Sequence, residues 1–345
     1  MQVVTGDLIK GKKILLRLDL DVLLENGRVI DDFRLKAGLP TLKLCLENAS
    51  NVVIIGHLGR PAEAGRPNGV EVPELSVAPV YQWFSEQGFK EDLESGKLKF
   101  LENLRFEKDE DEASMEFAHS IIDLVDPEDR GDVVFVNEAF AAHHPAASTI
   151  CLPKLLPHFA GLRFAEEVKK LNEVRNNPKR PLVAIIGGVK IEDKGPAIEA
   201  LSKFANTVLV GGKLADTSLA SALPHNVLLG KLTEDGFDVT EDTLDLWDGI
   251  IKGAGEIIWN GPVGKLEDGK AQGTYKLAKL IVDSKANIIV GGGDTVGFLS
   301  AAGLLDEFEN HGLPAGRQGF VSTGGGAMLK FLTDGTLPTI EALND

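Results

Sequence analysis

The sequence predicts an α/β protein with parallel sheets, because strongly apolar runs alternate with glycine-rich turns. Five such runs lie in the second half of the chain, and they read LVAIIGGVKIEDK, NTVLVGGK, EIIWNGPVG, NIIVGGGDT and GFVSTGGG. Nearly continuous Val, Ile and Leu is typical of strands that are buried in a parallel sheet. Ligands of such sheets bind at the carboxyl ends of the strands, where glycine lets the backbone approach and the next helix offers N–H donors to an anion. Five glycine turns along one edge therefore predict a nucleotide-phosphate site.

Arginine takes the place of glycine at the predicted strand ends of the first half. KILLRLDLD brings Arg17, Asp19 and Asp21 to the end of one run. Later segments add His57, Arg60, Arg34, Arg105, Asn137 and Glu138. A single arginine near a loop usually forms a surface salt bridge. Several at corresponding strand ends favour an anion pocket instead, because the guanidinium group holds phosphate and carboxylate in a fixed geometry.

Composition and charge exclude several classes of protein. A length of 345 residues suggests about two domains, and 43% hydrophobic residues are enough for a core. With 6% aromatic residues and a formal net charge of -16, a nucleic-acid-binding surface is not expected. No apolar stretch suits a membrane span or a signal peptide. The two cysteines, Cys45 and Cys151, indicate a reducing compartment, so we expect a cytoplasmic protein. The seven histidines show no zinc-binding spacing.

A helix is predicted between the two halves. Val168, Leu171 and Val174 recur at helical spacing in AEEVKKLNEVRNNPKRP, and the NNP sequence ends the helix. We interpret it as the connection between two α/β domains. A crossover helix within one larger sheet fits the periodicity equally well. Only the change from arginine to glycine at the strand ends separates the two interpretations.

Ten segments, in order, resemble those of the phosphoglycerate kinases. They are RLDLD, DDFRL, HLGRP, LENLRF, VNEAF, NPKRP, AIIGGVKIEDK, WNGPVG, GGGDT and STGGGA. The resemblance covers nearly the whole chain, and ten collinear segments are far more specific than one glycine motif. It implies an enzyme that transfers the acyl phosphate of 1,3-bisphosphoglycerate to Mg-ADP, giving 3-phosphoglycerate and ATP, in both directions. It also implies a monomer whose partners are ADP or ATP and phosphoglycerate, with Mg2+ as the cofactor of the nucleotide.

The same resemblance implies a fold and a division of labour. Two Rossmann-like domains with parallel sheets face each other across a cleft, are joined by an interdomain helix and close for the reaction. The phosphoglycerate-binding domain is then residues 1–161 with a returning tail of about 337–345. The helix is residues 162–178, and the nucleotide-binding domain is residues 179–336.

In the first domain, the resemblance implies contacts with the phosphoglycerate. These fall on Asp19, Leu20, Asp21, Arg34, His57, Leu58, Gly59, Arg60 and Arg105. Arg34 matches the arginine that approaches the transferring phosphoryl group. A positioned cation there stabilises the charge that spreads over the equatorial oxygens.

In the second domain, the resemblance implies contacts with the nucleotide. These fall on Gly187, Lys190, Lys194, Asn260, Pro262, Glu267, Gly292, Gly293, Asp294 and Thr295. Asp294 matches the residue that holds the magnesium ion, and Glu267 matches the acid that accepts from the ribose hydroxyls. Lys190 and Lys194 share one face if a helix begins near Ile191.

Catalysis in this class is positioning and electrostatic stabilisation, with no side chain acting as a nucleophile or general base. The residues implied in it are Arg34, Lys190, Lys194, Gly293 and Gly325. Ser322 and Thr323, in STGGGA, resemble part of a turn near the phosphates.

The chain departs from the family pattern in four places. Asp21 stands where asparagine is usual, and His144 is nearest to the position of a further arginine, so both changes bear on phosphoglycerate binding. The stretch 214–255 is short, which leaves the base selectivity of the nucleotide pocket open. An insertion at 311–319 reads as a surface loop with Arg317 in solvent.

Two other functions stay open on these departures. One is a protein that resembles phosphoglycerate kinase and binds nucleotide with weak or lost transfer activity. The other is a kinase for a different small carboxylate. The presence of Arg34, which concerns transfer rather than nucleotide binding, favours an active enzyme.

Overall fold

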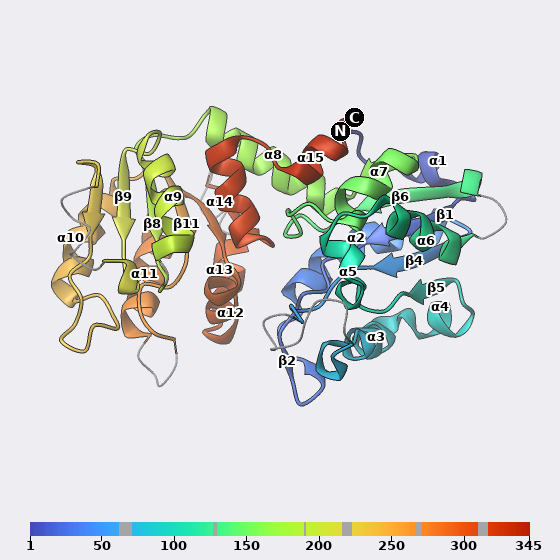
Figure 1. Ribbon diagram of the computed structural model, residues 1–345. Helices are drawn as coiled ribbons and strands as arrows, with labels where there is room; N and C mark the ends of the chain where they lie inside the picture. The colour runs from blue at the N-terminus through green and yellow to red at the C-terminus, as the bar shows by residue number, and fades with distance from the viewer. Residues whose placement is uncertain (62–70, 127–129, 190, 216–222, 267–270, 310–316) are drawn as a thin grey trace. The chain divides into compact units, whose positions relative to one another are not determined.

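The computed structural model describes residues 1–61, 71–126, 130–189, 191–215, 223–266, 271–309 and 317–345. The chain divides into two compact units (Figure 1). Unit 1 comprises Met1–Val168 and Thr336–Asp345, and unit 2 comprises Lys169–Gly335. Each unit has its own parallel sheet, of five strands in unit 1 and six in unit 2. The alternative of one larger sheet is therefore wrong, and the predicted α/β class is confirmed.

The sheet of unit 1 has the strand order β5-β4-β1-β6-β7. Its strands are β1 (Lys13–Arg17), β4 (Asn51–Ile55), β5 (Leu98–Phe100), β6 (Val133–Asn137) and β7 (His158–Ala160). Arg17 at the end of β1 lies opposite Ile55 of β4 and Asn137 of β6, so the polar segments that follow these strands leave the same edge. The order reverses between β1 and β6, and such a switch point is where doubly wound sheets bind ligands.

Helices and a small hairpin complete unit 1. They are α1 (Gly6–Ile9), the hairpin β2 (Leu24–Glu25) and β3 (Arg28–Val29), α2 (Phe33–Asn48), α3 (Ala78–Phe84), α4 (Lys90–Glu94), α5 (Lys108–Asp111), α6 (Met115–Val125), α7 (Leu152–Leu155) and α15 (Pro338–Ala342). Short 3-10 or π turns are η1 (Pro73–Leu75), η2 (Ser85–Phe89), η3 (Leu104–Phe106), η4 (Arg130–Asp132) and η5 (Ala147–Cys151). The C-terminal helix α15 packs against η5 within this unit.

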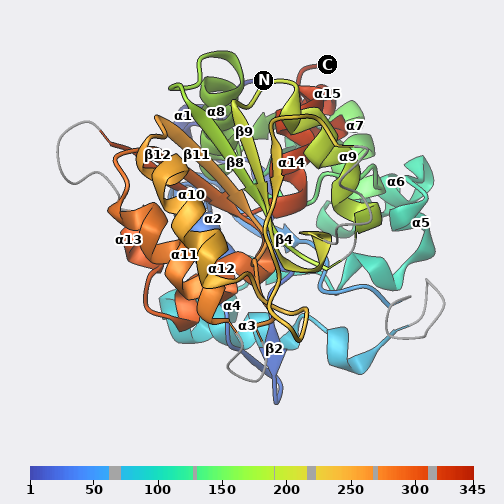
Figure 2. The ribbon, with the colours of Figure 1, turned by 90° about the vertical axis from the view of Figure 1, so that its left-hand side faces the viewer.

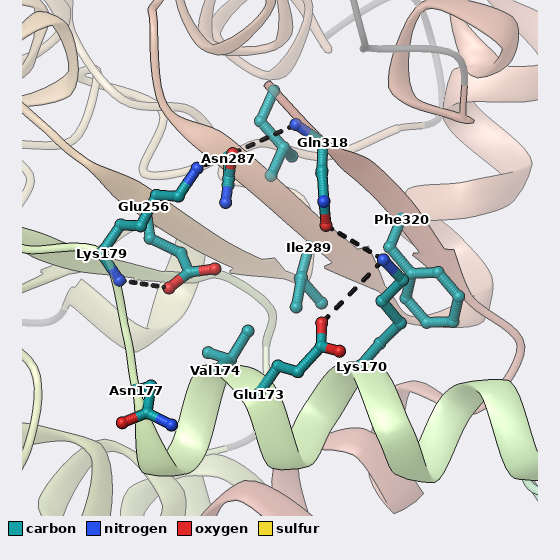
Figure 3. Close-up of a pocket in the computed structure, with 11 residues that line it drawn as sticks. Lys170, Glu173, Val174, Asn177, Lys179, Glu256, Asn287, Ile289, Gln318 and Phe320 are labelled. Carbon is teal, nitrogen blue, oxygen red and sulfur yellow. Dashed lines mark hydrogen bonds and ion pairs between the residues drawn. The ribbon is translucent and has the colours of Figure 1, made fainter. Parts of the chain in front are cut away.

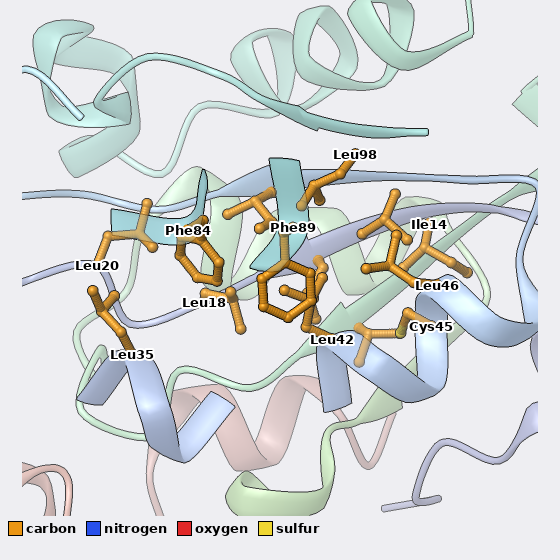
Figure 4. Close-up of a cluster of buried hydrophobic side chains, with 14 of the residues drawn as sticks. Ile14, Leu18, Leu20, Leu35, Leu42, Cys45, Leu46, Phe84, Phe89 and Leu98 are labelled. Carbon is orange, nitrogen blue, oxygen red and sulfur yellow. The ribbon is translucent and has the colours of Figure 1, made fainter. Parts of the chain in front are cut away.

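The core of unit 1 forms where α2 and α3 cover the apolar face of the sheet. Ile14 and Leu98 from the strands meet Leu42 from α2 and Phe84 from α3 (Figure 4). The four residues of β1 that follow Lys13 are all buried, as the continuous apolar run predicts for an inner parallel strand. This packing fixes the strand ends from which the polar residues project.

The sheet of unit 2 has the strand order β10-β9-β8-β11-β12-β13. Its strands are β8 (Leu182–Ile186), β9 (Thr207–Val210), β10 (Val227–Leu229), β11 (Glu256–Asn260), β12 (Asn287–Gly291) and β13 (Gly319–Ser322). The five glycine-turn runs of the sequence thus correspond to β8, β9, β11, β12 and β13, and all are parallel. The switch point of this sheet lies between β8 and β11.

The helices of unit 2 cover both faces of its sheet. They are α9 (Ile191–Ser202), the 3-10 turn η6 (Gly212–Ala215), α10 (Glu241–Lys252), α11 (Gln272–Asp283), α12 (Gly293–Ala301), α13 (Leu305–Glu309) and α14 (Gly325–Asp334). In Figure 2, α9 and α14 lie together on one face, and α10, α11 and α13 lie on the other. Right-handed crossovers on either side of the switch point require this distribution.

Helix α8 (Leu162–Asn176) begins in unit 1 and ends in unit 2. The negative charge at its N-terminus comes from Glu138 after β6, because the helix's own first turn contains Arg163 and no acid. The backbone N–H groups of Arg163 and Phe164 each donate to the Glu138 carboxylate at 3.0 Å, and the Thr41 hydroxyl donates to it at 2.5 Å. Burial raises the pKa of Glu138 to about 7, although these donors favour its charged form.

Candidate active site

The carboxyl edge of the unit 1 sheet gathers the arginines that the sequence singled out. His57 follows β4 and is 8% exposed. Burial holds the pKa of its imidazole well below the ordinary value, and four neighbouring guanidinium groups lower the pKa further. These groups, the arginine cluster, belong to Arg17, Arg34, Arg60 and Arg105. His57 is therefore a neutral ring among cations, and the positive charge gathered at this edge suits an anion.

Arg34, in the first turn of α2, is held by the two aspartates that follow β1. Its Nε lies 3.6 Å from Oδ2 of Asp19, and its Nη1 donates to the backbone carbonyl of Asp21 at 2.6 Å. The Asp19 carboxylate raises the pKa of Arg34, whereas burial raises the pKa of Asp19 itself. The guanidinium group is thus permanently charged and fixed in place, as electrostatic stabilisation of a transferring group requires.

Asp21 joins the loop after β1 to the loop after β4. Its Oδ1 accepts from the backbone N–H of Gly59 at 2.8 Å, and its Oδ2 lies 3.5 Å from Nη1 of Arg34. The Asp21 carboxylate, which stands where the family usually has asparagine, is thus an acceptor for two neighbours. An asparagine oxygen could accept the Gly59 hydrogen bond equally well, but it could not neutralise Arg34.

Leu20 and Leu58 can meet a ligand only through their backbone, because both side chains are buried in the core. The carbonyl of Leu58 already accepts from Nδ2 of Asn103 at 2.7 Å. Arg105 is bound to the same loop, since its Nη1 donates to the carbonyl of Gly59 at 2.9 Å. The two loops after β4 and β5 therefore hold each other at the edge.

Arg17 is one of the arginines that the sequence predicts for the anion pocket, although the family resemblance implies no contact of it with the phosphoglycerate. It is 2% exposed, its Nε donates to the Ser148 hydroxyl at 2.8 Å, and its Nη2 lies 3.4 Å from Nδ1 of His57. Glu110 lies 3.7 Å from the same nitrogen. Arg17 thus supports the His57 ring from inside. No local pattern reveals this, because Glu110 and Ser148 come from distant segments.

His144 follows β6 in the sequence, where the family pattern has an additional arginine. It is exposed, and its ring stacks on His143 with 4.2 Å between the ring centroids. Its backbone carbonyl accepts from the Thr149 hydroxyl at 3.0 Å. The ring pair is thus carried by a loop that η5 anchors.

In unit 2, the turns after β8 and β11 touch each other at the switch point. The backbone N–H of Gly187 donates to the carbonyl of Asn260 at 2.9 Å. A Cβ at Gly187 would lie 2.1 Å from the carbonyl oxygen of Pro262, so only glycine fits here. The close approach explains why glycine stands at the end of this strand.

Asn260 ties together three segments of the predicted nucleotide site. Its side chain is buried, and its Nδ2 donates to the carbonyl of Gly291 at 2.9 Å and to that of Gly325 at 3.2 Å. Its Oδ1 accepts from Nζ of Lys194 in α9. A Cβ at Gly325 would lie 2.2 Å from Cα of Gly292, so the α12 and α14 starts are in contact. Asn260 therefore positions a cation and two helix N-termini.

Helix α12 begins at the predicted phosphate turn. Gly292 is its N-cap at φ 114°, and a Cβ at Gly293 would meet nothing within 4 Å, so the backbone there is open to a ligand. Asp294 is exposed in the first turn. The Thr295 side chain points inward instead, because its hydroxyl accepts from the Gly261 N–H at 2.9 Å. The N–H groups of α12 are thus available to an anion.

Helix α14 starts directly after β13. Ser322 and Thr323 are buried, and the Ser322 hydroxyl accepts from the Gly324 N–H at 3.2 Å. The serine therefore shapes the turn that leads into the helix.

A cavity of about 330 Å³ opens at this edge. Its lining comes from the turns after β8, β9 and β11, from the loop before α10 and from the start of α12. The lining residues are Gly188, Val189, Gly212, Lys213, Phe237, Pro262, Gly264, Lys265, Leu266 and Asp294. Pro262 and Asp294 were predicted. Lys213, Phe237 and Lys265 were not, although Lys213 closes the GGK turn that the sequence pattern singled out.

Several predicted positions lie outside the described residues. They are Lys190, Glu267 and most of the insertion at 311–319. Arg317, at the end of that insertion, is described, and its Nη2 donates to the carbonyl of Val282 at 3.1 Å, near the end of α11. Its side chain is thus half-buried and hydrogen-bonded to the backbone, rather than fully in solvent.

A second cavity, of about 250 Å³, lies at the opposite edge of the unit 2 sheet (Figure 3). Glu256 and Asn287, at the amino ends of β11 and β12, line it with Lys170, Glu173 and Lys179. Lys170 Nζ donates to Oε1 of Gln318 at 3.0 Å, and the backbone N–H of Lys179 donates to Glu256 at 2.8 Å. These contacts satisfy the polar groups locally, and the amino edge is not the ligand edge of a doubly wound sheet.

The two ligand edges differ in chemistry, since unit 1 offers guanidinium groups and unit 2 offers backbone N–H groups, lysine and a cavity. Two parallel-sheet units, one with guanidinium groups and one with helix N-termini at the carboxyl edge, have the arrangement expected of a two-domain kinase. The sequence model of the phosphoglycerate kinase family matches residues 5–234 and 225–335. The chain belongs to the phosphoglycerate kinase family, whose members are phosphotransferases.

Individual members of the family match this chain over almost its whole length. A phosphoglycerate kinase of Leptospira biflexa is 32% identical over 403 residues, which cover 97% of this chain and 96% of the relative. That alignment is longer than this chain, so the relative has segments that are absent here. The two family matches overlap at 225–234, within the stretch 214–255 that is shorter than usual for the family.

Solved structures of phosphoglycerate kinases also match this chain. The phosphoglycerate kinase of Coxiella burnetii has a TM-score of 0.75 at 30% identity and covers 97% of both chains. That of Pyrococcus horikoshii has a TM-score of 0.79 at 23% identity, covering 100% of this chain and 98% of that one, which shows the shared fold. Within the residues that the structure describes, none of the helices has the length and apolar character of a membrane span.

Proposed function

We propose that this chain is a phosphoglycerate kinase that moves a phosphoryl group between the carboxyl group of 3-phosphoglycerate and Mg-ADP or Mg-ATP, in both directions. The observation that carries the proposal is the pairing of two ligand edges in one chain. One edge holds the arginine cluster, and the other holds two helix N-termini joined through Asn260 to Lys194. Family membership supports the choice of substrates.

The phosphoglycerate is proposed to bind at the arginine cluster of unit 1. Arg60 and Arg105 hold its phosphate, while Asp19 and the backbone of Gly59 contact the glycerate. Arg34 stands beside the carboxyl group that accepts the phosphoryl group. Its ion pairs with Asp19 and Asp21 keep the guanidinium group oriented before the substrate arrives, so little reorganisation is needed in the transition state.

The nucleotide is proposed to bind along the carboxyl edge of unit 2. The N–H groups at the starts of α12 and α14 contact its phosphates, with Gly293 leaving the backbone open to them and Gly325 allowing the two helix starts to meet. Lys194, held by Asn260, contributes a positive charge, and Lys190 and Glu267 are proposed to act with it as the family pattern implies. The base and ribose occupy the cavity beside Pro262.

Magnesium fits this site as an ion that arrives with the nucleotide. Among the described residues, no group of three or more His, Cys, Asp and Glu side chains could hold a metal alone. Mg2+ commonly uses one or two carboxylates together with substrate phosphates and water, and Asp294 is an exposed carboxylate on the cavity wall. When bound, the ion neutralises phosphate charge. Asp294 holds it at the start of α12.

Transfer requires the two substrates to meet and water to be excluded, so we propose that the units close over them. We further propose that the enzyme acts as a monomer in the cytoplasm. Both cysteines are free and buried, which suits a reducing compartment.

A coupled assay of ATP consumption with 3-phosphoglycerate, with and without Mg2+, tests this function. Arg34→Ala should abolish magnesium-dependent turnover while ADP still binds. Arg28→Ala, on the exposed hairpin strand β3, is the matched control and should turn over normally. Absence of turnover in the unaltered protein, with ADP binding intact, would favour a nucleotide-binding protein without transfer activity.

A further inference from the structure

The cavity at the carboxyl edge of unit 2 contains two lysines where a base would lie. Nζ of Lys213 and Nζ of Lys265 are each 5.4 Å from the centroid of the Phe237 ring. Both distances are within the range of cation–π contact. Two ammonium groups therefore share one aromatic ring on the cavity wall.

The strand order separates these lysines from the phosphate end of the site. Lys213 follows β9 and Asp294 follows β12, and β8 and β11 lie between them. Three inter-strand steps of about 4.8 Å place the two turns roughly 14 Å apart along the edge. A nucleotide whose phosphates meet α12 and α14 would extend its base toward the β9 side. The Phe237 ring and the two lysines are at that side.

The loop that carries Phe237 is fixed to its neighbours. Oδ2 of Asp238 accepts from the Gly273 N–H at 2.7 Å, at the start of α11. The backbone N–H of Lys265 donates to the carbonyl of Phe237 at 3.1 Å. Asp238 is 8% exposed, so this anchor is internal. The ring and Lys265 consequently keep their relative position.

We propose that this cavity selects a purine with an oxygen at position 6, so that guanine and hypoxanthine nucleotides are used at least as well as adenine nucleotides. This inference rests on the proposed function of the site. An ammonium group is a donor only. Guanine presents the acceptors O6 and N7, whereas adenine presents a donor, N6–H2, next to N7.

The rest of the wall supports this selectivity. Val189, Pro262 and Leu266 supply apolar surface for the faces of a flat base. Asp294 is the one acidic side chain among the described lining residues, and it belongs to the phosphate end. Lysine donors at Lys213 and Lys265 therefore suit the acceptors O6 and N7 on the edge of such a base.

The test compares kcat/KM for MgATP, MgGTP and MgITP, with 3-phosphoglycerate as the acceptor. The unaltered protein should use GTP and ITP at least as well as ATP. Because ITP lacks the 2-amino group, use of GTP and ITP that is equal and above that of ATP shows that O6 is read. Lys213→Met and Lys265→Met should each lower the GTP-to-ATP ratio about tenfold, the effect of losing a hydrogen bond to a charged donor.

Lys203→Met is the matched control, because Lys203 is 71% exposed and pairs with Glu199 on α9 outside the cavity. Its GTP-to-ATP ratio should equal that of the unaltered protein. A tenfold preference of the unaltered protein for ATP, or a ratio that Lys213→Met leaves unchanged, would overturn the inference.

Failure of the proposed function can be told apart from failure of this inference. If no nucleotide supports transfer, titration calorimetry with MgGDP and MgADP decides the base preference on the same protein. Binding of MgGDP at least as tight as that of MgADP upholds the selectivity even without turnover. Tighter binding of MgADP, or binding of neither, rejects it.

Discussion

Replacing Asn260 with alanine is expected to weaken unit 2 and to slow turnover together. The buried side-chain amide donates to the carbonyls of Gly291 and Gly325, so its removal breaks these two hydrogen bonds, besides the one from Lys194, and leaves two buried acceptors without this donor. At about 1 kcal/mol for each bond, with an added penalty for the stranded carbonyls, the free energy of unfolding should fall by about 2–3 kcal/mol. For a unit of this size, the corresponding fall in Tm is roughly 5–10 °C.

Thermal unfolding and steady-state kinetics on one preparation test this prediction. Asn226→Ala is the control, because the Asn226 amide also donates to two carbonyls, those of Ser202 and Ala205, away from the ligand edge. It should lower Tm with little change in kcat. Asn260→Ala should also lower kcat/KM at least tenfold, because Lys194 and the helix starts lose their common support. Equal kinetics in the two variants would refute the positioning role of Asn260.

Three further predictions concern single groups. Gly325→Ala should lower the free energy of unfolding by about 1–3 kcal/mol, because its Cβ would lie 2.2 Å from Cα of Gly292. Gly293→Ala should leave Tm unchanged, because its Cβ would meet nothing within 4 Å, but calorimetry should show weaker nucleotide binding. Because the pKa of Glu138 is raised to about 7, this group stabilises the fold most below its ordinary pKa and loses that stabilisation as pH rises toward 7; urea titrations of Glu138→Gln should lack this dependence. Because the pKa of His57 is lowered, its contribution to the stability of the fold is present above pH 6.5, its ordinary pKa, and is lost as pH falls below that value. NMR should therefore show a neutral ring at pH 6.5, and a protonated ring there would contradict the burial of His57 among the arginines.

The parallel sheets and the positions of the glycine turns were predictable from the sequence. Buried parallel strands have a strong signal in continuous Val, Ile and Leu, and each glycine turn is a local feature next to its strand. The starts of α9 at Ile191 and α12 at Gly293 follow from the same local signals. The residue assignments, in contrast, came from the family resemblance and stay predictions.

What the sequence did not reveal depends on contacts between distant segments. The support of His57 by Arg17, Glu110 and Ser148 joins three segments that have no common pattern. The same holds for Glu138 at the start of α8 and for the two lysines beside Phe237. Such contacts follow from strand order, and periodicity carries no information about which strands become neighbours.

The fate of the phosphoryl group is the most direct test of the proposed transfer. The protein is incubated with MgATP, 3-phosphoglycerate and hydroxylamine, which traps an acyl phosphate as a hydroxamate. Magnesium-dependent hydroxamate should form with the unaltered protein and be absent with Arg34→Ala. Release of inorganic phosphate from ATP without hydroxamate would contradict transfer to the carboxyl group of 3-phosphoglycerate.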